Sequence, residues 1–145
     1  MKRILILCTG NSARSQISEG LFRQIGGKEF DIHSAGTHPA GMVHPLAIAT
    51  MKERGIDISR QWSKSMDQYQ GEKFDYVITV CDEAYRECPF FPGATHQLHW
   101  STPDPSFVGS TEEERREAFR ETITSLEARI RELVSQIKNE KAASV

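Results

Sequence analysis

The sequence predicts an α/β fold in which a parallel sheet is flanked by helices, a three-layer sandwich. Short apolar runs suited to buried strands alternate along the chain with segments whose apolar residues recur at helical spacing. This alternation indicates right-handed crossovers and a parallel sheet. The 145 residues, 38% hydrophobic and 26% charged, suffice for one compact domain with its own core. We expect that domain at residues 1–138 and a frayed tail at 139–145.

The first half of the chain carries two strand and helix pairs. The strand at 4–7 is apolar throughout, as in a strand buried on both faces. In the helix that follows it, over 15–25, the apolar residues fall on one face. A second strand at 30–33 leads through small residues to a helix over 45–54, which Gly55 is expected to end.

The second half adds two strands and the longest helix. Residues 74–80 are rich in β-branched and aromatic side chains, and 97–100 is a short final strand. The run Ser110-Thr111-Glu112-Glu113 reads as the capping-box start of the last helix. Its apolar residues alternate gaps of four and three, which also suits a coiled-coil seam, but the seam is short and we favour packing on the sheet. These residues are Phe119, Ile123, Leu126, Ile130, Leu133 and Ile137.

Composition excludes several classes of function. The net charge is −2 and no basic stripe occurs, so we expect a small-molecule partner and no nucleic acid. No apolar run approaches the roughly 18 residues of a membrane span, and the short apolar start is no export signal, so we expect no membrane partner and a cytoplasmic location. The three cysteines should then rest as thiols, and a disulfide among them would be transient.

The turn after the first strand is the main candidate site. Cys8 precedes Arg14 by six positions, with a glycine-containing turn between them and a helix after them. The free N–H groups of the helix start and the helix dipole attract an anion, and Arg14 grips two of its oxygens. Helix N-termini and arginine lower a cysteine pKa, so Cys8 is the predicted nucleophile. The predicted oxyanion-binding loop comprises Thr9, Gly10, Asn11, Ser12, Ala13 and Arg14. The alternative is that Cys8 is a small buried apolar residue.

Cys81 follows the strand at 74–80 as Cys8 follows the first strand. In a parallel sheet both sulfurs lie at the same edge, within reach of a disulfide if the two strands are neighbours. Cys88 lies seven residues further on, about 10.5 Å along a helix. A bond between Cys81 and Cys88 would need that segment to unwind, and Pro89 disfavours a permanent helix there. The alternative is that both are unrelated thiols.

Asp104 and the histidines complete the survey. Asp104, between two prolines, is a rigidly held carboxyl that suits a general acid, although Pro-Asp-Pro is also an ordinary turn. No metal site is predicted, because structural zinc usually shows close pairs of Cys or His. Ordinary structural or surface roles are assigned to His33, His38, His44, His96 and His99.

Together these motifs resemble the thioredoxin-coupled arsenate reductases, which share the fold of the low-molecular-weight protein tyrosine phosphatases. The resemblance covers nearly the whole chain. It implies a sheet in the order 2-1-3-4, with the strands of Cys8 and Cys81 adjacent. The matching segments are Cys8-Thr9-Gly10-Asn11-Ser12, Arg14-Ser15-Gln16, Glu19-Gly20, Ser34-Ala35-Gly36, His44-Pro45, Gly55-Ile56-Asp57-Ile58-Ser59, Cys81, Cys88-Pro89 and Asp104-Pro105.

The resemblance also implies a reaction. Cys8 attacks arsenate held by the loop amides and Arg14, and Asp104 protonates the departing hydroxyl. Cys81 attacks the Cys8 sulfur and releases arsenite, and Cys88 then attacks Cys81. The resulting disulfide is reduced by thioredoxin, with no tightly bound cofactor. By the same resemblance Ser15 bonds the Cys8 thiolate and Asn11 shapes the loop, and phosphate or sulfate would bind as analogues of arsenate.

Two positions depart from the family pattern. Ala13 stands where many relatives carry another cysteine, which leaves three thiols, enough for the relay. In some relatives Asn11, Glu19, Ser34 and an aspartate surround a potassium ion, and the aspartate position is Lys64 here. We predict that the Lys64 ammonium replaces the ion.

Besides arsenate reduction, two other functions stay open on the sequence. A phosphatase acting on phosphotyrosine or small phosphomonoesters needs Cys8, Arg14 and Asp104, but Gln16 and Ser106 stand where phosphatases of this family usually have proline and an aromatic residue. A non-catalytic anion-binding or redox-sensing module would not need a general acid. The electron donor of a reductase is thioredoxin or, alternatively, glutathione with glutaredoxin.

Overall fold

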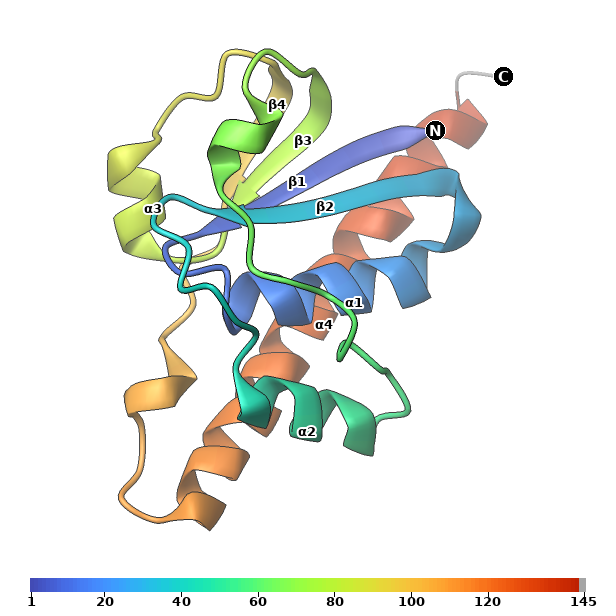
Figure 1. The fold of residues 1–145 in the computed structure, drawn as a ribbon. Helices are drawn as coiled ribbons and strands as arrows, with labels where there is room; N and C mark the ends of the chain where they lie inside the picture. The colour runs from blue at the N-terminus through green and yellow to red at the C-terminus, as the bar shows by residue number, and fades with distance from the viewer. Residues whose placement is uncertain (144–145) are drawn as a thin grey trace.

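The computed structural model describes residues 1–143 (Figure 1). Four strands alternate with helices along the chain, as predicted, and the bounds differ from the prediction mainly in the second half. The strands are β1 (Lys2–Cys8), β2 (Phe30–Gly36), β3 (Phe74–Thr79) and β4 (Ala94–His99). The helices are α1 (Arg14–Gly26), α2 (Pro45–Glu53), α3 (Asp82–Glu87) and α4 (Glu112–Ala143), with 3₁₀ turns η1 (Gly27–Glu29), η2 (Met66–Tyr69) and η3 (Pro105–Phe107).

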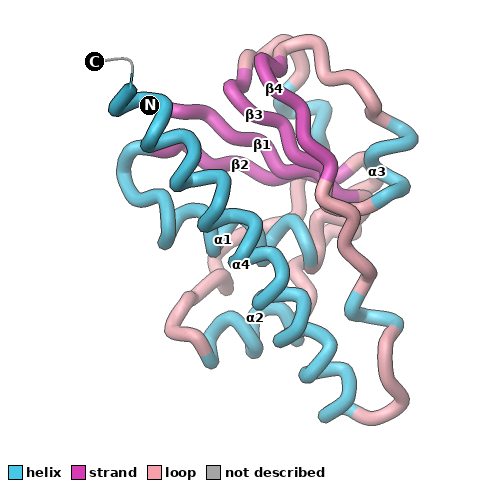
Figure 2. The backbone as a smooth tube through the Cα atoms, turned by 180° about the vertical axis from the view of Figure 1, so that it is seen from behind, coloured by secondary structure: helices cyan, strands magenta, loops and turns pink. Residues whose placement is uncertain are grey.

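The strands form one parallel sheet in the order β2-β1-β3-β4, which confirms the predicted order. Seen from behind, α1 and α4 cross one face of the sheet, and α2 lies below them (Figure 2). On the opposite face, η2 and the chain around Cys88 cover the strands. The sheet is thus flanked on both faces. Long helices cover one face, and only the short turn η2 and the segment around Cys88 cover the other.

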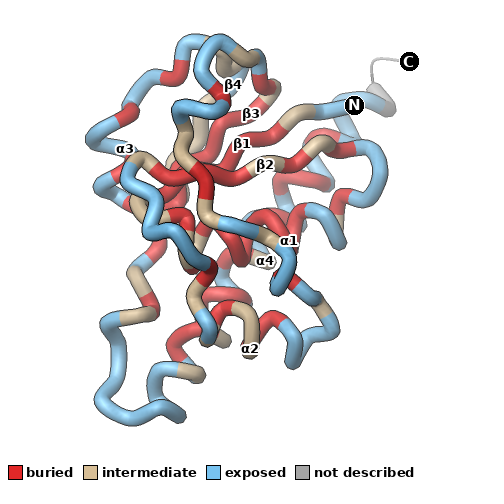
Figure 3. Tube along the Cα trace, viewed as in Figure 1, coloured by how far each residue is buried: buried red, intermediate tan, exposed pale blue. Residues whose placement is uncertain are grey.

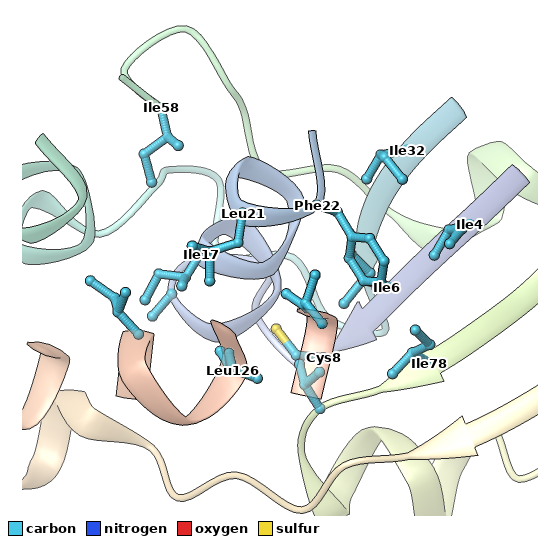
Figure 4. Packing of buried hydrophobic residues seen from close by; sticks show 14 of the residues in the cluster. Ile4, Ile6, Cys8, Ile17, Leu21, Phe22, Ile32, Ile58, Ile78 and Leu126 are labelled. Carbon is cyan, nitrogen blue, oxygen red and sulfur yellow. The ribbon is translucent and has the colours of Figure 1, made fainter. Parts of the chain in front are cut away.

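Two apolar cores follow from the alternation of side chains along the central strand. Ile4 and Ile6 of β1 point to the face covered by α1 and α4, and Leu5 and Leu7 point to the other. All four are 0% exposed. The middle of β1 is accordingly coloured as buried in Figure 3. Figure 4 shows the larger core, in which the Cys8 sulfur ends the β1 row. The nucleophile candidate therefore sits where the core meets the loop.

Helix α4 packs within its own chain. All six apolar residues of its four-and-three pattern are buried in the larger core, and α4 contacts α1, α2 and η3. The pattern therefore describes a helix packed on its own domain, as favoured above. The Thr111 hydroxyl accepts from the Glu114 N–H at 3.1 Å and so caps its start.

Three boundaries correct the prediction. Helix α4 continues through residues 139–143, beyond the domain end expected at 138, because Ile137 stays buried against the core and the last turns of α4 follow it. Fraying of this tail stays a prediction. The rest of that tail, 144–145, lies outside the described residues. The last strand begins at Ala94, since pairing with β3 runs from Phe74 to Thr79 and extends β4 toward its start. A helix, α3, forms where Pro89 had argued against one.

Phe119 offers a test of the core. It is 0% exposed and its ring contacts that of His44 at 4.8 Å between centroids. Phe119→Ala is expected to lower the free energy of unfolding by about 3–5 kcal/mol, because it removes a buried ring and leaves a cavity. Denaturant unfolding measures this. Phe107→Ala, at a ring that is 89% exposed, is the control and should change it by less than about 0.5 kcal/mol. Similar losses in both variants would contradict the assignment of α4 to the core.

Candidate active site

The turn between β1 and α1 forms a loop whose carbonyl groups point outward. The segment after β2 holds them there: the N–H groups of Thr37, His38, Ala40 and His44 donate to the carbonyls of Cys8, Thr9, Gly10 and Ser12 at 2.8–3.1 Å. Because a peptide unit is planar, a carbonyl bonded outward turns the N–H of the next residue inward. The loop therefore presents N–H groups to its own concave side, as predicted.

Glycine at the end of β2 makes this close approach possible. A Cβ atom at Gly36 would lie 2.5 Å from the Thr9 carbonyl oxygen and 3.1 Å from the Asn11 nitrogen. Asn11 itself has a φ of 48°, a left-handed conformation that asparagine tolerates better than most residues. Helix α1 begins at Arg14 after Ala13, and no side chain caps its N-terminus. Its first amides are therefore available to an anion in the loop.

The Cys8 sulfur lies inside this loop. Its Sγ atom is 2.9 Å from the Ser15 hydroxyl and accepts from the Asn11 N–H at 3.2 Å. The Asn11 side-chain amide donates to the Ser15 oxygen at 2.8 Å. Because Ser15 already accepts that bond, its own proton is free to point at sulfur. Ser15 can therefore donate to Cys8 when the sulfur is a thiolate.

The orientation of the Asn11 amide is fixed from its other side. Its Oδ1 atom accepts from the Lys64 N–H at 2.8 Å and from the Gln16 side chain at 3.0 Å. The amide nitrogen must then face Ser15 and Ser34, whose hydroxyl in turn donates to Glu19 at 2.6 Å. A buried chain of hydrogen bonds therefore runs from the Glu19 carboxylate to the Cys8 sulfur.

Burial works against ionisation of this sulfur. Burial of the 3% exposed residue raises the pKa of the Cys8 thiol above its ordinary value, and the neighbouring Cys81 acts in the same direction. The Ser15 hydroxyl, the Ser15 N–H and the Arg14 guanidinium oppose this rise. The predicted low pKa is therefore wrong, because the sequence could not show how completely the chain covers the sulfur.

Arg14 links the loop to the predicted acid. Its guanidinium donates to the Thr102 carbonyl at 2.8 Å and lies 3.6 Å from Asp104 Oδ2. The other carboxylate oxygen, Oδ1, accepts from the backbone N–H and the hydroxyl of Ser106. Ser106 thus fixes the carboxylate so that Oδ2 faces the loop. Asp104 therefore lies beside Arg14 of the loop, and its role as a general acid stays a prediction.

Cys81 lies beside the loop, at the end of the strand adjacent to β1. Pairing of β1 with β3 continues to the last residues of each strand, where the Val80 N–H donates to the Leu7 carbonyl at 2.9 Å. The Cys81 sulfur is 3.3 Å from the Thr9 hydroxyl, which also lies 3.3 Å from Glu83. The expectation that Cys8 and Cys81 share one edge on neighbouring strands is therefore confirmed.

Helix α3 separates Cys81 from Cys88. The Cys81 sulfur caps the start of α3 by accepting from the Ala84 N–H at 3.4 Å, and two acidic residues follow it in the first turn. These interactions stabilise the helix despite Pro89. The proline keeps only the residue before it, Cys88, out of helical geometry, at φ −134° and ψ 67°. Burial raises the pKa of Cys88, whose thiol points to the Phe90 carbonyl. The two thiols cannot meet while α3 persists.

Lys64 reaches the far end of the hydrogen-bond chain. Its ammonium lies 3.5 Å from Glu19 Oε1, donates to the Trp62 carbonyl at 3.0 Å, and lies over the Trp62 ring. Burial lowers the pKa of Lys64, and Glu19 opposes this shift. Among residues 1–143 no group of three or more His, Cys, Asp or Glu side chains is placed to hold a metal ion.

Residues 3–143 match the family described as low molecular weight phosphotyrosine protein phosphatase. The chain belongs to this family. Within residues 1–143, no helix is long and apolar enough to cross a membrane.

Relatives within the family are arsenate reductases. The arsenate reductase of Halalkalibacterium halodurans is 42% identical over 130 residues, covering 90% of this chain and 93% of the relative. A structure of an arsenate reductase in the phosphate binding state aligns with a TM-score of 0.81 and 31% identity, over 94% of this chain and 99% of that one. A thioredoxin-dependent arsenate reductase from Corynebacterium glutamicum aligns at 0.74 and 32%, over 97% and 63%. The predicted resemblance is confirmed.

Some site residues escaped the sequence analysis. Ser106, noted only as a departure from the phosphatases, fixes Asp104, and the Thr102 carbonyl holds Arg14. Glu83 contacts Thr9, and His99 binds the first residue of α3. Except for the local bond of Ser106 to Asp104, these contacts join segments far apart in the chain. A polar residue two positions after an aspartate was a visible signal only for Ser106.

Ser15→Ala tests the donor assignment at Cys8. Loss of the hydroxyl removes an influence that lowers the Cys8 pKa, so the pKa should rise and the pH at which alkylation by iodoacetamide becomes half-maximal should move upward. At fixed neutral pH the rate should fall about tenfold, as for a lost hydrogen bond to a charged group. Mass spectrometry of the Cys8 peptide measures both. Ser18→Ala is the control: this buried hydroxyl of α1 bonds only the Arg14 carbonyl, and an equal shift there would refute the assignment.

Proposed function

We propose that this chain is an arsenate reductase that converts arsenate to arsenite through its three cysteines, for arsenic detoxification. The observation that carries the proposal is the placement of Cys81 at the mouth of the loop that holds Cys8, with Cys88 one short helix away. A phosphatase needs the first thiol and not the other two. The similarity to arsenate reductases along nearly the whole chain supports the same conclusion.

In the first step the inward N–H groups and Arg14 bind the arsenate oxygens. A hydrogen arsenate dianion accepts the Cys8 proton, so that substrate binding supplies the thiolate that burial disfavours in the free loop. Ser15 and the Asn11 N–H stabilise this thiolate. The sulfur attacks arsenic, a sulfur–arsenic bond forms, and Asp104 donates a proton to the hydroxyl that leaves as water.

Two disulfide exchanges follow. The Cys81 thiolate attacks Cys8, the sulfur–arsenic bond breaks, and its electron pair stays on arsenic, which leaves as arsenite. Cys88 then attacks Cys81, and Cys8 departs as a thiolate. Reduced thioredoxin supplies two electrons to the Cys81–Cys88 disulfide, with no tightly bound cofactor. The similarity to a thioredoxin-dependent reductase favours this donor over glutathione with glutaredoxin. The three free thiols fit the reducing cytoplasm.

The decisive experiment measures arsenite formation by the wild type with thioredoxin, thioredoxin reductase and NADPH. Cys81→Ser and Cys88→Ser are each expected to reduce steady-state turnover by more than about 100-fold, because no disulfide accessible to thioredoxin forms. Slow hydrolysis of an aryl phosphate should persist in both, since it needs only Cys8, Arg14 and Asp104. Normal arsenate turnover in Cys81→Ser would refute the relay. Rapid phosphatase activity without arsenate reduction by the wild type would favour the phosphatase, and absence of both activities an anion-binding module.

The residues around Glu19 do not fit a resident potassium ion. A cation is already there, because the Lys64 ammonium lies between Glu19 and the Trp62 carbonyl. The reaction therefore has no step through potassium. The rate of arsenate reduction should be the same in potassium and sodium chloride at equal ionic strength. A strong and specific increase in potassium would contradict this assignment.

Lys64→Met tests the same pair through stability. Loss of the ammonium leaves the 2% exposed Glu19 with the Arg23 ion pair at 3.0 Å and the hydrogen bond from the Ser34 hydroxyl at 2.6 Å. The free energy of unfolding should fall by about 2 kcal/mol, less than for a fully unpaired buried charge. Adding Glu19→Gln should recover part of this loss in denaturant unfolding, because it removes the charge that lost its partner. No recovery would show that Lys64 acts through packing alone.

A further inference from the structure

We propose that His99 is a positioning residue that holds Cys81 in place for its attack on Cys8. This inference rests on the proposed function. Its basis is that one imidazole ring, from the end of β4, bonds the chain on both sides of Cys81. The ring itself belongs to neither the loop nor the set of reacting thiols.

The two bonds of the ring are short and well defined. The His99 Nδ1 atom is 2.7 Å from the hydroxyl of Thr79, which lies two residues before Cys81. The Nε2 atom is 2.8 Å from Oδ1 of Asp82, the residue after Cys81. A carboxylate only accepts, so Nε2 carries a proton and donates to Asp82. In the neutral ring, Nδ1 is then the acceptor for the Thr79 hydroxyl. Cys81 is thus enclosed between two residues fixed to one ring.

Packing holds the ring itself. The Tyr85 ring, one turn further along α3, stacks on His99 with 4.4 Å between centroids and 17° between planes. The His99 side chain is 24% exposed. The bond from His99 is the main influence that lowers the Asp82 pKa, and it keeps this carboxylate an acceptor. The first turn of α3 is therefore attached to the end of β4 by a hydrogen bond and by a stacked ring.

This attachment matters because attack within a protein depends on geometry. A thiolate must approach the sulfur that it attacks in line with the bond that breaks, and small displacements slow such reactions strongly. Cys81 sits in extended backbone at φ −141° and ψ 151°, and its sulfur contacts Thr9 of the loop. Pairing with β1 fixes the chain up to Val80. From Cys81 onward, His99 adds its two hydrogen bonds to the contacts that Thr9 makes with Cys81 and Glu83.

The experiment isolates the step in which Cys81 attacks. In a Cys88→Ser background the relay stops at the Cys8–Cys81 disulfide, with one arsenite released per chain. Reduced protein is mixed with arsenate, quenched with acid at intervals, and the disulfide is quantified by mass spectrometry. Adding His99→Ala should slow disulfide formation about fivefold or more, the effect of one or two lost hydrogen bonds on a rate. His99→Gln, which keeps hydrogen-bonding groups, should restore part of the rate.

Alkylation of Cys8 by iodoacetamide reports the state of the loop in the same proteins and should change less than about twofold, because His99 makes no contact with it. The matched control is His96→Ala, which removes another β4 histidine stacked on a tyrosine, Tyr76, at 4.8 Å. It should leave both rates unchanged.

The outcomes separate this inference from the proposed function. If the Cys88→Ser protein forms no Cys8–Cys81 disulfide with arsenate, the proposed function fails and this inference with it. If that disulfide forms and His99→Ala forms it equally fast, only the positioning role is refuted. An equal fall in disulfide formation and Cys8 alkylation would assign His99 a general structural role and would also refute it.

Discussion

Parallel pairing of β1 between β2 and β3 is the constraint on which the site depends. It aligns the ends of three strands, so that the loop after β1, the segment after β2 and Cys81 after β3 meet at one edge. Each contributes something different. The first supplies N–H groups and a thiol, the second turns the carbonyls of the first outward, and the third brings a second thiol. No one of these segments forms the site alone, which is typical of the carboxyl edge of an open α/β sheet.

The site combines two demands that oppose each other. The sulfur must lie inside the loop to reach a bound oxyanion, but its burial there disfavours its charged form. The hydrogen-bond chain from Glu19 through Ser34, Asn11 and Ser15 partly offsets this by delivering a donor to Cys8. In the proposed mechanism, a bound oxyanion that accepts the thiol proton offsets the remaining cost of ionising Cys8. The thiolate then forms where a substrate is present to react with it.

Helix α3 determines the order of events in the proposed relay. While it is wound, Cys81 faces the loop and Cys88 lies in the smaller core on the other side of the sheet edge. The first disulfide therefore forms between strands, where no large movement is needed. The second requires α3 to unwind, and losing the Cys81 sulfur as cap of its first turn favours that change. Chemistry at Cys81 and the stability of α3 are thus coupled.

The sequence by itself determined the sheet, its flanking helices and the loop, because these depend on local signals: apolar runs, helical spacing, and a cysteine and arginine around a glycine turn. Family resemblance supplied the strand order and the relay. Only the tertiary structure decided the pKa shift of Cys8, the helix between Cys81 and Cys88, the continuation of α4 to Ala143, and the contacts of Ser106 and His99. The pKa shift, the course of α4 and the His99 contacts depend on burial or on bonds between residues distant in the chain, whereas the Ser106 bond and the cap of α3 are local contacts that the sequence pattern left open. Contacts between distant residues are set when the whole domain packs, and no local pattern encodes them.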